Sequence, residues 1–430
     1  MISRFKFHPV GQGCFYSGEM YIHLFRRYNH FNMVYDCGAS FDKEYLHQEI
    51  EHYKKRLFRS SLDVLFISHL DNDHVNGVSR LLEGIECNEI YLPYLAPIER
   101  LYVALRFISG QDEDSDGDDA PDYLRFLQSP DDYLLSEEKF KIKRLIYING
   151  NDDKINFEQD GEIKKLPSEP NNEQPEFLNQ LSDDNSGDAE IAGIKEKHNQ
   201  KVNFKKGNGK LLLNYIWEFY LYYNRTARIN EEELKQSINK IYNIDVDNQL
   251  TKNQLVQILN DNNRLTDLKR EINQSRSAIN TSGLLLMHKP INYKYAEIHR
   301  ENLYSYGFPS KYCSRYFPRR FNSKITRNKN NDWGITLLTG DTCLNQVNNS
   351  TYIEARKKNV HVFQVPHHGS ETGWDDGINL NDLNNKGITD AIINFGYGNH
   401  YGHPKSRIIS DLIDNNFQIF YCTQFEQYDY

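Results

Sequence analysis

One short stretch of the sequence, SHLDNDHVNG, concentrates four side chains that can bind metal ions. His69, Asp71, Asp73 and His74 directly follow the apolar run LDVLFIS. Such a run predicts a buried strand, so the four side chains are expected on the loop at its C-terminal end, with a helix beginning near Val75. Ligands of open α/β sheets bind at that edge. Alternate residues of an extended segment point the same way, so the first three side chains can converge while His74 turns in from the helix start.

A simpler interpretation is that Asp71 and Asp73 cap the helix and that the histidines are incidental surface residues. One aspartate is enough for a cap, so two carboxylates with two imidazoles favour a metal site. Carboxylate and imidazole ligands without thiolate suit zinc, manganese or iron, and each aspartate in place of a histidine shifts the preference towards harder ions. We therefore expect two divalent metal ions, with zinc as the first choice and manganese as its rival.

Predicted strands and helices, which must position this loop, alternate along the chain as in α/β proteins. Apolar side chains at helical spacing predict a helix over residues 42–57. The same texture resumes near residue 280 with the runs NTSGLLLMH, WGITLLTGD, HVFQVPHHGS and DAIINFG, and a final amphipathic helix is expected over residues 405–417. In the first part of the chain, strands are predicted at residues 5–10, 33–36, 62–68 and 89–92.

The composition changes between these two halves. QDEDSDGDDAPD is acidic, and residues 151–190 contain few large apolar side chains, so we expect a solvated surface insertion there. Helical spacing is found over residues 211–223 and then in EEELKQSINKIY and TKNQLVQILNDNNRLTDLKREI. The insertion helices are expected to cap the α/β core, with binding of a protein partner through residues 211–275 as the alternative. The predicted units are residues 1–109, a mainly helical and acidic insertion at 110–279, and residues 280–430.

The sequence resembles the metallo-β-lactamase superfamily, whose first metal motif is HxHxDH. This chain has HLDNDH, with Asp71 where most members carry histidine. That variant is similar to the hydrolase domain of DNA-uptake competence proteins and to phosphorylcholine esterases. VGQGC, YDCG, NTSGLLL, LLTGDT, VPHHGS and NHYGHP follow in the family's order. The resemblance covers residues 1–109 and 280–430, and it implies the αββα sandwich of this superfamily, interrupted by the insertion.

The resemblance also implies a role for each matching residue. His69 and Asp71 would bind one metal ion, and Asp73 and His74 would bind the other. Asp341 of the TGD motif would bridge both ions, since a carboxylate can bind one ion through each oxygen; taken alone, it would be a turn residue at a strand end. Asp73 is also expected to be essential for turnover.

The last two motifs supply further candidates. His367, the first histidine of PHHGS, would complete the second metal site, although alone it would be a buried histidine near a core strand. His403 of GHP would be a last ligand or, like His368, would assist the leaving group in catalysis; a histidine held by packing at a helix start is the alternative. Asn399 is expected to contact the substrate. Ser370 is expected to be a turn or cap residue, because no separate base is reserved for it.

Two departures from the family pattern concern how complete the metal site is. Most members have a further metal histidine between the first motif and the bridging aspartate. No residue of this chain is a secure equivalent: His288 follows GLLLM at a predicted strand end, but the subgroup does not obviously use this position. Cys14 of VGQGC replaces the usual acidic residue. One metal ion is therefore expected to have fewer ligands or partial occupancy.

A basic segment, SRYFPRRFNSKITRNKNN, precedes the strand that leads to Asp341. Its Arg315, Arg319 and Arg320 alternate with aromatic residues. Cations contact phosphates and aromatic side chains stack on exposed bases, so this segment predicts a nucleic acid or another phosphodiester as substrate. A solvated basic loop that balances the acidic insertion is the alternative.

Composition limits the protein's surroundings. The net charge of -9 over 430 residues gives no global basic footprint, so contact with nucleic acid must be local. Six cysteines without a CxxC pair predict a reduced set. No apolar run reaches spanning length, and the N-terminus lacks the apolar core of a signal peptide. We therefore expect a cytoplasmic protein with no membrane partner.

The expected function is a two-metal phosphodiesterase, a nuclease acting on DNA or RNA, in which a metal-bound hydroxide attacks the phosphate and no serine or cysteine intermediate forms. Hydrolysis of a small phosphodiester or ester is the second possibility. The third is a non-catalytic scaffold or regulatory subunit of a multi-protein system, such as bacterial defence.

Overall fold

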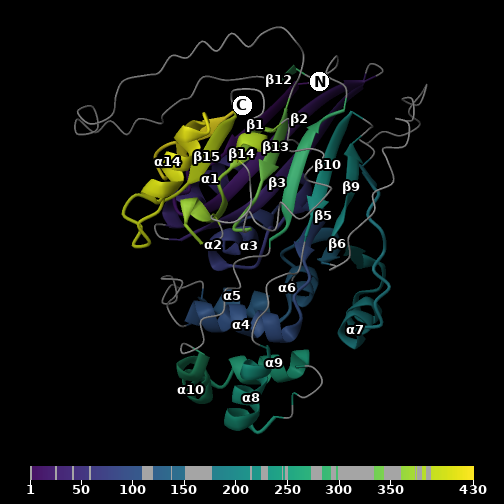
Figure 1. The fold of residues 1–430 in the computed structure, drawn as a ribbon. Helices are drawn as coiled ribbons and strands as arrows, with labels where there is room; N and C mark the ends of the chain where they lie inside the picture. The colour runs from purple at the N-terminus through teal and green to yellow at the C-terminus, as the bar shows by residue number, and fades with distance from the viewer. Residues whose placement is uncertain are drawn as a thin grey trace.

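A computed structural model of the chain forms two mixed β-sheets with helices around them (Figure 1). The α/β class expected from the sequence is confirmed. The structure describes residues 2–24, 27–40, 43–57, 60–108, 120–136, 138–150, 177–213, 216–223, 231–244, 246, 250–272, 283–291, 297–298, 334–342, 360–372, 374, 380–383 and 389–430.

The first sheet contains nine strands among the described residues, in the order β12-β1-β2-β3-β4-β5-β6-β8, with β17 also beside β1. β1, β2 and β3 pair antiparallel, and the strands from β3 to β8 pair in parallel. The strands are β1 (Ile2–Phe7), β2 (Gly13–Leu24), β3 (Arg27–Ala39), β4 (Ser61–Phe66), β5 (Glu86–Pro93), β6 (Lys141–Asn149), β8 (Val202–Lys206), β12 (Glu297–Ile298) and β17 (Tyr428–Asp429).

The second sheet has eight strands in the described part of the chain, in the order β16-β15-β14-β13-β11-β10-β9-β7. The strands from β13 to β16 pair in parallel, and the remaining pairs are antiparallel. The strands are β7 (Phe177–Asn179), β9 (Asn208–Leu213), β10 (Trp217–Tyr222), β11 (Leu285–Pro290), β13 (Ile335–Leu338), β14 (Val360–Gln364), β15 (Asp390–Asn394) and β16 (Gln418–Cys422).

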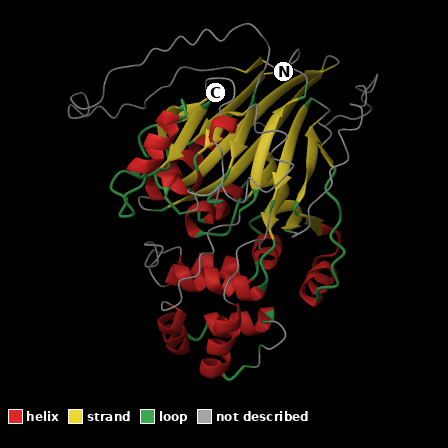
Figure 2. Cartoon of the chain, viewed as in Figure 1, coloured by secondary structure: helices red, strands yellow, loops and turns green. Residues whose placement is uncertain are grey.

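Helices gather at one end and along the sides of the strands (Figure 2). In Figure 1, α4 and α5 lie below the sheets, and α8, α9 and α10 lie beyond them, farther from the strands. The described helices are α1 (Lys43–Arg56), α2 (Asn72–Val75), α3 (Val78–Leu82), α4 (Pro97–Ile108), α5 (Ala120–Gln128), α6 (Pro130–Ser136), α7 (Ala189–His198), α8 (Glu231–Tyr242), α9 (Lys252–Leu259), α10 (Asn262–Ile272), α13 (Leu380–Leu383) and α14 (Ser406–Asp414), with short 3₁₀ helices at Asn199–Lys201 and Pro366–Gly369.

Three apolar clusters hold these elements together. The first contains inward side chains of both sheets, including Phe66 of β4 and Phe219 of β10, whose rings lie 6.0 Å apart. The second joins the other face of the first sheet to helices α1 and α3 to α10. The third joins the second sheet to α13 and α14. Side chains of both sheets thus meet in the first cluster, and helices contribute apolar side chains to the other two.

Several local predictions from the sequence are confirmed. The helix expected over residues 42–57 is α1, the strands expected in the first part of the chain overlap β1, β3, β4 and β5, and α14 lies within residues 405–417. The strand expected at residues 5–10 ends earlier, at Phe7. The helix after the histidine-rich loop begins at Asn72, slightly before the expected start at Val75.

The helix expected over residues 211–223 is wrong, because this segment contains part of β9 and all of β10. All six residues of β10 are buried. A strand that is covered on both faces is continuously apolar, so its sequence lacks the alternation that distinguishes strands from helices. β6 and β8 also fall within residues 110–279 and extend the first sheet, so this segment is less helical than expected. The division at residues 109 and 279 stays a prediction.

The described helices include none that is long and apolar enough to cross a membrane. Cys14, Cys37, Cys87 and Cys422 are buried and free, and Cys313 and Cys343 lie outside the described residues.

Candidate metal centre

A buried carboxylate, Asp36 near the end of β3, fixes the histidine-rich loop. It accepts hydrogen bonds from the backbone N–H and the Oγ–H of Ser68, both at 2.6 Å, and its Oδ2 lies 2.8 Å from Nδ1 of His74. A carboxylate at Nδ1 keeps the proton on that nitrogen, so the lone pair of His74 lies on Nε2. The Ser68 hydroxyl donates its hydrogen bond to Asp36. The Ser68 oxygen can therefore accept a hydrogen bond from Nδ1–H of His69, 2.8 Å away. Both histidines thus offer Nε2 as a ligand atom.

The carboxylate of Asp341 faces four imidazoles. Its Oδ1 lies 3.3 Å from Nε2 of His74 and 3.9 Å from Nε2 of His368. Its Oδ2 lies 3.7 Å from Nε2 of His69 and 3.9 Å from Nε2 of His367. Asp341 follows β13, whereas His69 and His74 follow β4, so the two sheets contribute jointly to the centre. The structure thus brings four of the predicted histidines around Asp341, and the metal-binding roles expected for them stay predictions.

The atoms at the middle of this cluster are poorly satisfied by the protein itself. Nε2 of His69, Nε2 of His74 and Oδ1 of Asp341 are buried and make no hydrogen bond to any described residue. Three such atoms within 4.8 Å of one another are costly unless a further group binds them. Two ligands of one zinc ion lie about 3.0–3.5 Å apart, so small side-chain movements would fit these atoms around a divalent cation. The residues present therefore fit a metal ion.

A second group of ligand atoms overlaps the first. Nε2 of His368 lies 3.2 Å from Oδ2 of Asp73, and Oδ1 of Asp73 lies 3.9 Å from Nε2 of His74. Nδ1–H of His368 donates to the backbone oxygen of Asn394 at 2.9 Å, so Nε2 is the nitrogen that faces Asp73 and that would bind a metal ion after losing its proton. His74 belongs to both groups, but one imidazole nitrogen can bind only one ion. The second group therefore needs another ligand when the first is complete.

Asp71 lies between His69 of the cluster and the guanidinium of Arg106. Its Oδ2 lies 3.8 Å from Nε2 of His69 and 3.4 Å from Nη1 of Arg106, which stands in the last turn of α4. On the same loop, the Tyr123 hydroxyl of α5 donates to the Leu70 carbonyl at 2.7 Å. Helices α4 and α5 thus touch the ligand loop directly, which its sequence did not suggest.

The turns that carry the later ligands have unusual backbone geometry. His367 and His368 both have positive φ, at 49° and 55°, a conformation that costs non-glycine residues on the order of 1–2 kcal/mol each. Such strain often marks functional sites. Gly340 in the TGD turn has φ 53°, and a Cβ there would lie 2.7 Å from Ser68 Oγ. Only glycine lets this turn approach the loop that carries His69.

Charge and burial oppose one another in this cluster. Burial would raise the pKa of Asp341, but the imidazoles of His367, His74 and His368 hold it well below its usual value. Burial likewise would raise the pKa of Asp73, yet His74 and His368 lower it to about 2. A proton and a metal ion would therefore compete for the imidazole nitrogens that face these carboxylates.

The histidines respond in opposite directions. Burial disfavours the charged form of His74, but Asp341, Asp73 and Asp36 hold its pKa well above the usual value. The pKa of His368 is also raised against the effect of burial, by its bond to Asp73 and by Asp341. Burial lowers the pKa of His367 despite Asp341.

His403 lies at the edge of the centre. Its ring is 6.0 Å from that of His367, and burial together with the His368 and His367 imidazoles lowers its pKa to about 3. Asn399 holds the loop in place, since its Nδ2 donates to the Gly396 and His403 carbonyls and its Oδ1 accepts from the His403 N–H. The Asn399 amide is thus engaged by its own loop, and the predicted contact with substrate stays a prediction. Arg315, Arg319 and Arg320 lie outside the described residues.

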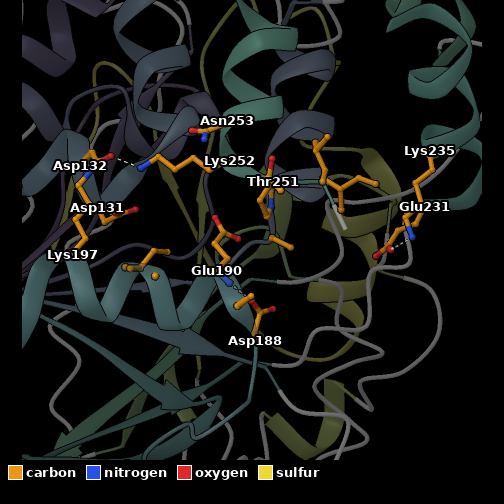
Figure 3. A pocket seen from close by; sticks show the side chains of 17 residues that line it. Asp131, Asp132, Asp188, Glu190, Lys197, Glu231, Lys235, Thr251, Lys252 and Asn253 are labelled. Atoms are coloured by element: carbon orange, nitrogen blue, oxygen red, sulfur yellow. Dashed lines mark hydrogen bonds and ion pairs between the residues drawn. The ribbon is translucent and has the colours of Figure 1, made fainter. Parts of the chain in front are cut away.

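A second cavity, of about 720 Å³, lies among the helices (Figure 3). None of its described lining residues belongs to the candidate metal centre. Asp132 there pairs with Lys197 of α7 and Lys252 of α9, and Nε2 of His198 lies 3.0 Å from Asp131 Oδ2 and 3.1 Å from Asp132 Oδ1. Because cationic groups already surround these carboxylates, we interpret this group as an ion-pair network that joins three helices.

Sequence reasoning did not assign roles to Asp36, Ser68 or Arg106. Asp36 stands in YDCG and Ser68 begins SHLDNDHVNG, so both fell within motifs that were noticed as patterns. No local signal indicated Arg106. No model of a known protein family matches the sequence, and no curated protein is significantly similar to it.

Proposed function

We propose that the protein is a metal-dependent hydrolase of the metallo-β-lactamase type that cleaves phosphodiesters. The observation that carries this proposal is the set of buried Nε2 atoms of His69 and His74 that face the Asp341 carboxylate without a hydrogen-bond partner among the described residues. The packing of two sheets with helices on their outer faces supports the αββα sandwich of that superfamily.

His69, Asp71 and Asp341 would hold one divalent cation, and Asp73, His74 and Asp341 the other, zinc or manganese in each case. His367 and His368 stand ready to complete the second site. Two such cations, when bound, lower the pKa of a shared water and neutralise charge that develops on a phosphoryl group. The protein's own contribution is to fix the ligand atoms, through Asp36 and Ser68 behind the histidines.

Arg106 favours an anionic substrate. Its guanidinium is half-buried beside Asp71, and a guanidinium presents several donors in a planar fork that matches phosphate oxygens. A neutral ester would gain little from this group. We therefore infer that phosphodiesters, including nucleic acids, are better substrates than carboxylic esters.

His403 would contribute a hydrogen bond to the substrate. With a pKa of about 3 it is neutral at physiological pH, so its ring can donate one N–H without carrying charge. Asn399 sets the position of this ring through the backbone of the loop. A role for His403 in protonating the leaving oxygen would require a higher pKa in the substrate complex.

The first test is metal content, measured by inductively coupled plasma mass spectrometry on protein purified without chelator. We expect about two zinc or manganese ions per chain, and loss of metal in Asp341→Asn and His74→Gln. His198→Gln is the matched control, because it changes a histidine that also contacts two carboxylates but belongs to the ion-pair network. The loaded protein should hydrolyse bis-p-nitrophenyl phosphate. A wild-type protein that holds little metal even after reconstitution would overturn the proposal.

A scaffold role through residues 211–275 is the alternative. β9 and β10 are largely buried in the second sheet, so among the described residues of this segment a partner would contact the helical part, α8 to α10. A stable complex formed by metal-free protein would favour this alternative.

We also infer a cytoplasmic location, as the reduced cysteines suggest.

A further inference from the structure

Exposed aromatic side chains gather at one corner of the described structure. Five large apolar side chains are exposed among the described residues, and three of them, Tyr397, Tyr421 and Phe425, lie together, with exposed fractions of 41%, 40% and 44%. The other two, Tyr21 and Ile413, stand on β2 and α14. We call Tyr397, Tyr421 and Phe425 the aromatic surface.

Ring contacts make this surface continuous. The rings of Tyr397 and Phe425 are stacked, 6.0 Å apart with planes 26° from parallel. Phe395 joins the two tyrosines, since its ring lies 5.5 Å from both Tyr397 and Tyr421. Tyr45 of α1 meets Phe425 edge-on at 5.7 Å. Neighbours thus hold the exposed rings in fixed orientations, which reduces the entropy lost when a planar ligand stacks on them.

The aromatic surface lies close to the candidate metal centre. Asn394, whose carbonyl holds His368, precedes Tyr397 by three residues, and three residues span at most about 11 Å. On the same loop, the Tyr401 ring stacks on His403 at 5.6 Å, and the His403 ring lies 6.0 Å from His367. A strand of substrate that leaves the metal centre along this loop would reach the exposed rings.

Local charge is compatible with a polyanion. The whole chain has a net charge of -9, yet residues 395–407, FGYGNHYGHPKSR, contain Lys405 and Arg407 and no carboxylate. Lys405 is anchored beside the loop, because its Nζ donates to the Tyr401 carbonyl at 2.7 Å. This segment therefore carries two cations and no carboxylate, whereas Glu426 follows Phe425 and interacts with Tyr421 on the other side of the aromatic surface.

We propose that the aromatic surface binds unpaired bases of a single-stranded nucleic acid whose backbone enters the metal centre. Stacking requires bases with free faces, which a duplex does not offer, so single strands are the favoured substrate class. This inference rests on the proposed function for the placement of the cleaved phosphate, but binding to the aromatic surface can be measured without turnover.

The test compares binding of a fluorescein-labelled, phosphorothioate-linked oligothymidylate of about 12 nucleotides with binding of a duplex of equal length, by fluorescence anisotropy on the metal-loaded protein. Tyr397→Leu/Phe425→Leu should weaken single-strand binding about tenfold or more. Tyr421→Leu gives an independent second variant. Tyr21→Leu, which alters an equally exposed tyrosine elsewhere, should bind as the wild type does.

Unchanged single-strand affinity in both surface variants, or an equal loss for single strand and duplex, would overturn the proposal. Measuring hydrolysis distinguishes a failure of this proposal from a failure of the proposed function. Hydrolysis of bis-p-nitrophenyl phosphate together with variant-independent oligonucleotide binding overturns the aromatic surface alone. Metal-loaded protein that binds the single strand through these rings but cleaves no diester supports the surface and overturns the phosphodiesterase.

Discussion

Asp36 and His74 form a closed pair: Oδ2 and Nδ1 lie 2.8 Å apart, and the two side chains are 0% and 1% exposed. The pair fixes which nitrogen of His74 faces the metal centre. Asp36 stands in β3 and His74 in α2, which follows β4, and β3 and β4 are parallel neighbours. The orientation of this ligand is thus determined by the packing of the first sheet.

Asp36→Asn should weaken metal binding about 10–100-fold while the protein stays folded. An asparagine NH₂ group facing Nδ1 would favour the tautomer that carries its proton on Nε2, the atom needed by the metal. Competition with a coloured zinc chelator measures the affinity, and circular dichroism checks the fold. His198→Gln serves as control. Unaltered affinity in Asp36→Asn would show that His74 is not a ligand.

Arg106→Gln should lower kcat/KM for bis-p-nitrophenyl phosphate about 10–100-fold, because a hydrogen bond to a charged group contributes about 1.5–3 kcal/mol. Arg106→Lys should recover part of this loss, since it keeps the charge but not the planar fork. Metal content distinguishes the causes. If both variants lose metal, Arg106 acts by positioning Asp71 and not by binding the substrate.

Gly340→Ala should destabilise the protein more than Gly398→Ala. Both glycines have positive φ, at 53° and 83°, but a Cβ at position 398 meets nothing within 4 Å. Gly398→Ala therefore reports the conformational cost alone, about 1–2 kcal/mol. Gly340→Ala adds the contact with Ser68 and should also reduce metal content. Urea unfolding measures both variants, and equal losses would contradict the close approach of the TGD turn.

His288→Phe should make stability less sensitive to acid. Burial lowers the pKa of His288 to about 3, whereas in the unfolded chain it is about 6.5. The stability that depends on neutral His288 is present above pH 6.5 and is lost as pH falls towards 3, by about 1.4 kcal/mol per unit well below 6.5. Urea midpoints at pH 7.5 and 5.5 should therefore differ less in the variant than in the wild type. If the midpoint changed equally with pH in the variant and in the wild type, the pKa of His288 would not differ between the folded and the unfolded protein.

The sequence predicted the elements whose signals are local. The helix α1 and the ligand loop after β4 follow from apolar spacing and from residue types that stand next to one another. β10 was mistaken for helix because burial on both faces removes the polar alternation on which strand prediction depends.

Relations between distant residues could not be predicted in the same way. Whether His367 or His368 faces Asp73 depends on the positive φ of both residues, which in turn depends on the packing around them. The pairing of Arg106 with Asp71 requires α4 to pack with its last turn beside the ligand loop. The spacing of residue types along the sequence predicts neither of these two contacts.

The division of the ligands between the two sheets has a consequence for the order of events in folding. His69, Asp71, Asp73 and His74 are synthesised early, whereas Asp341 and His368 come more than 260 residues later. Contacts across such a separation form slowly, because a long loop must close before they are made. Under the proposed function, the early residues alone would therefore be an incomplete site during synthesis, and binding of a cation would be a late step that joins residues of the two sheets.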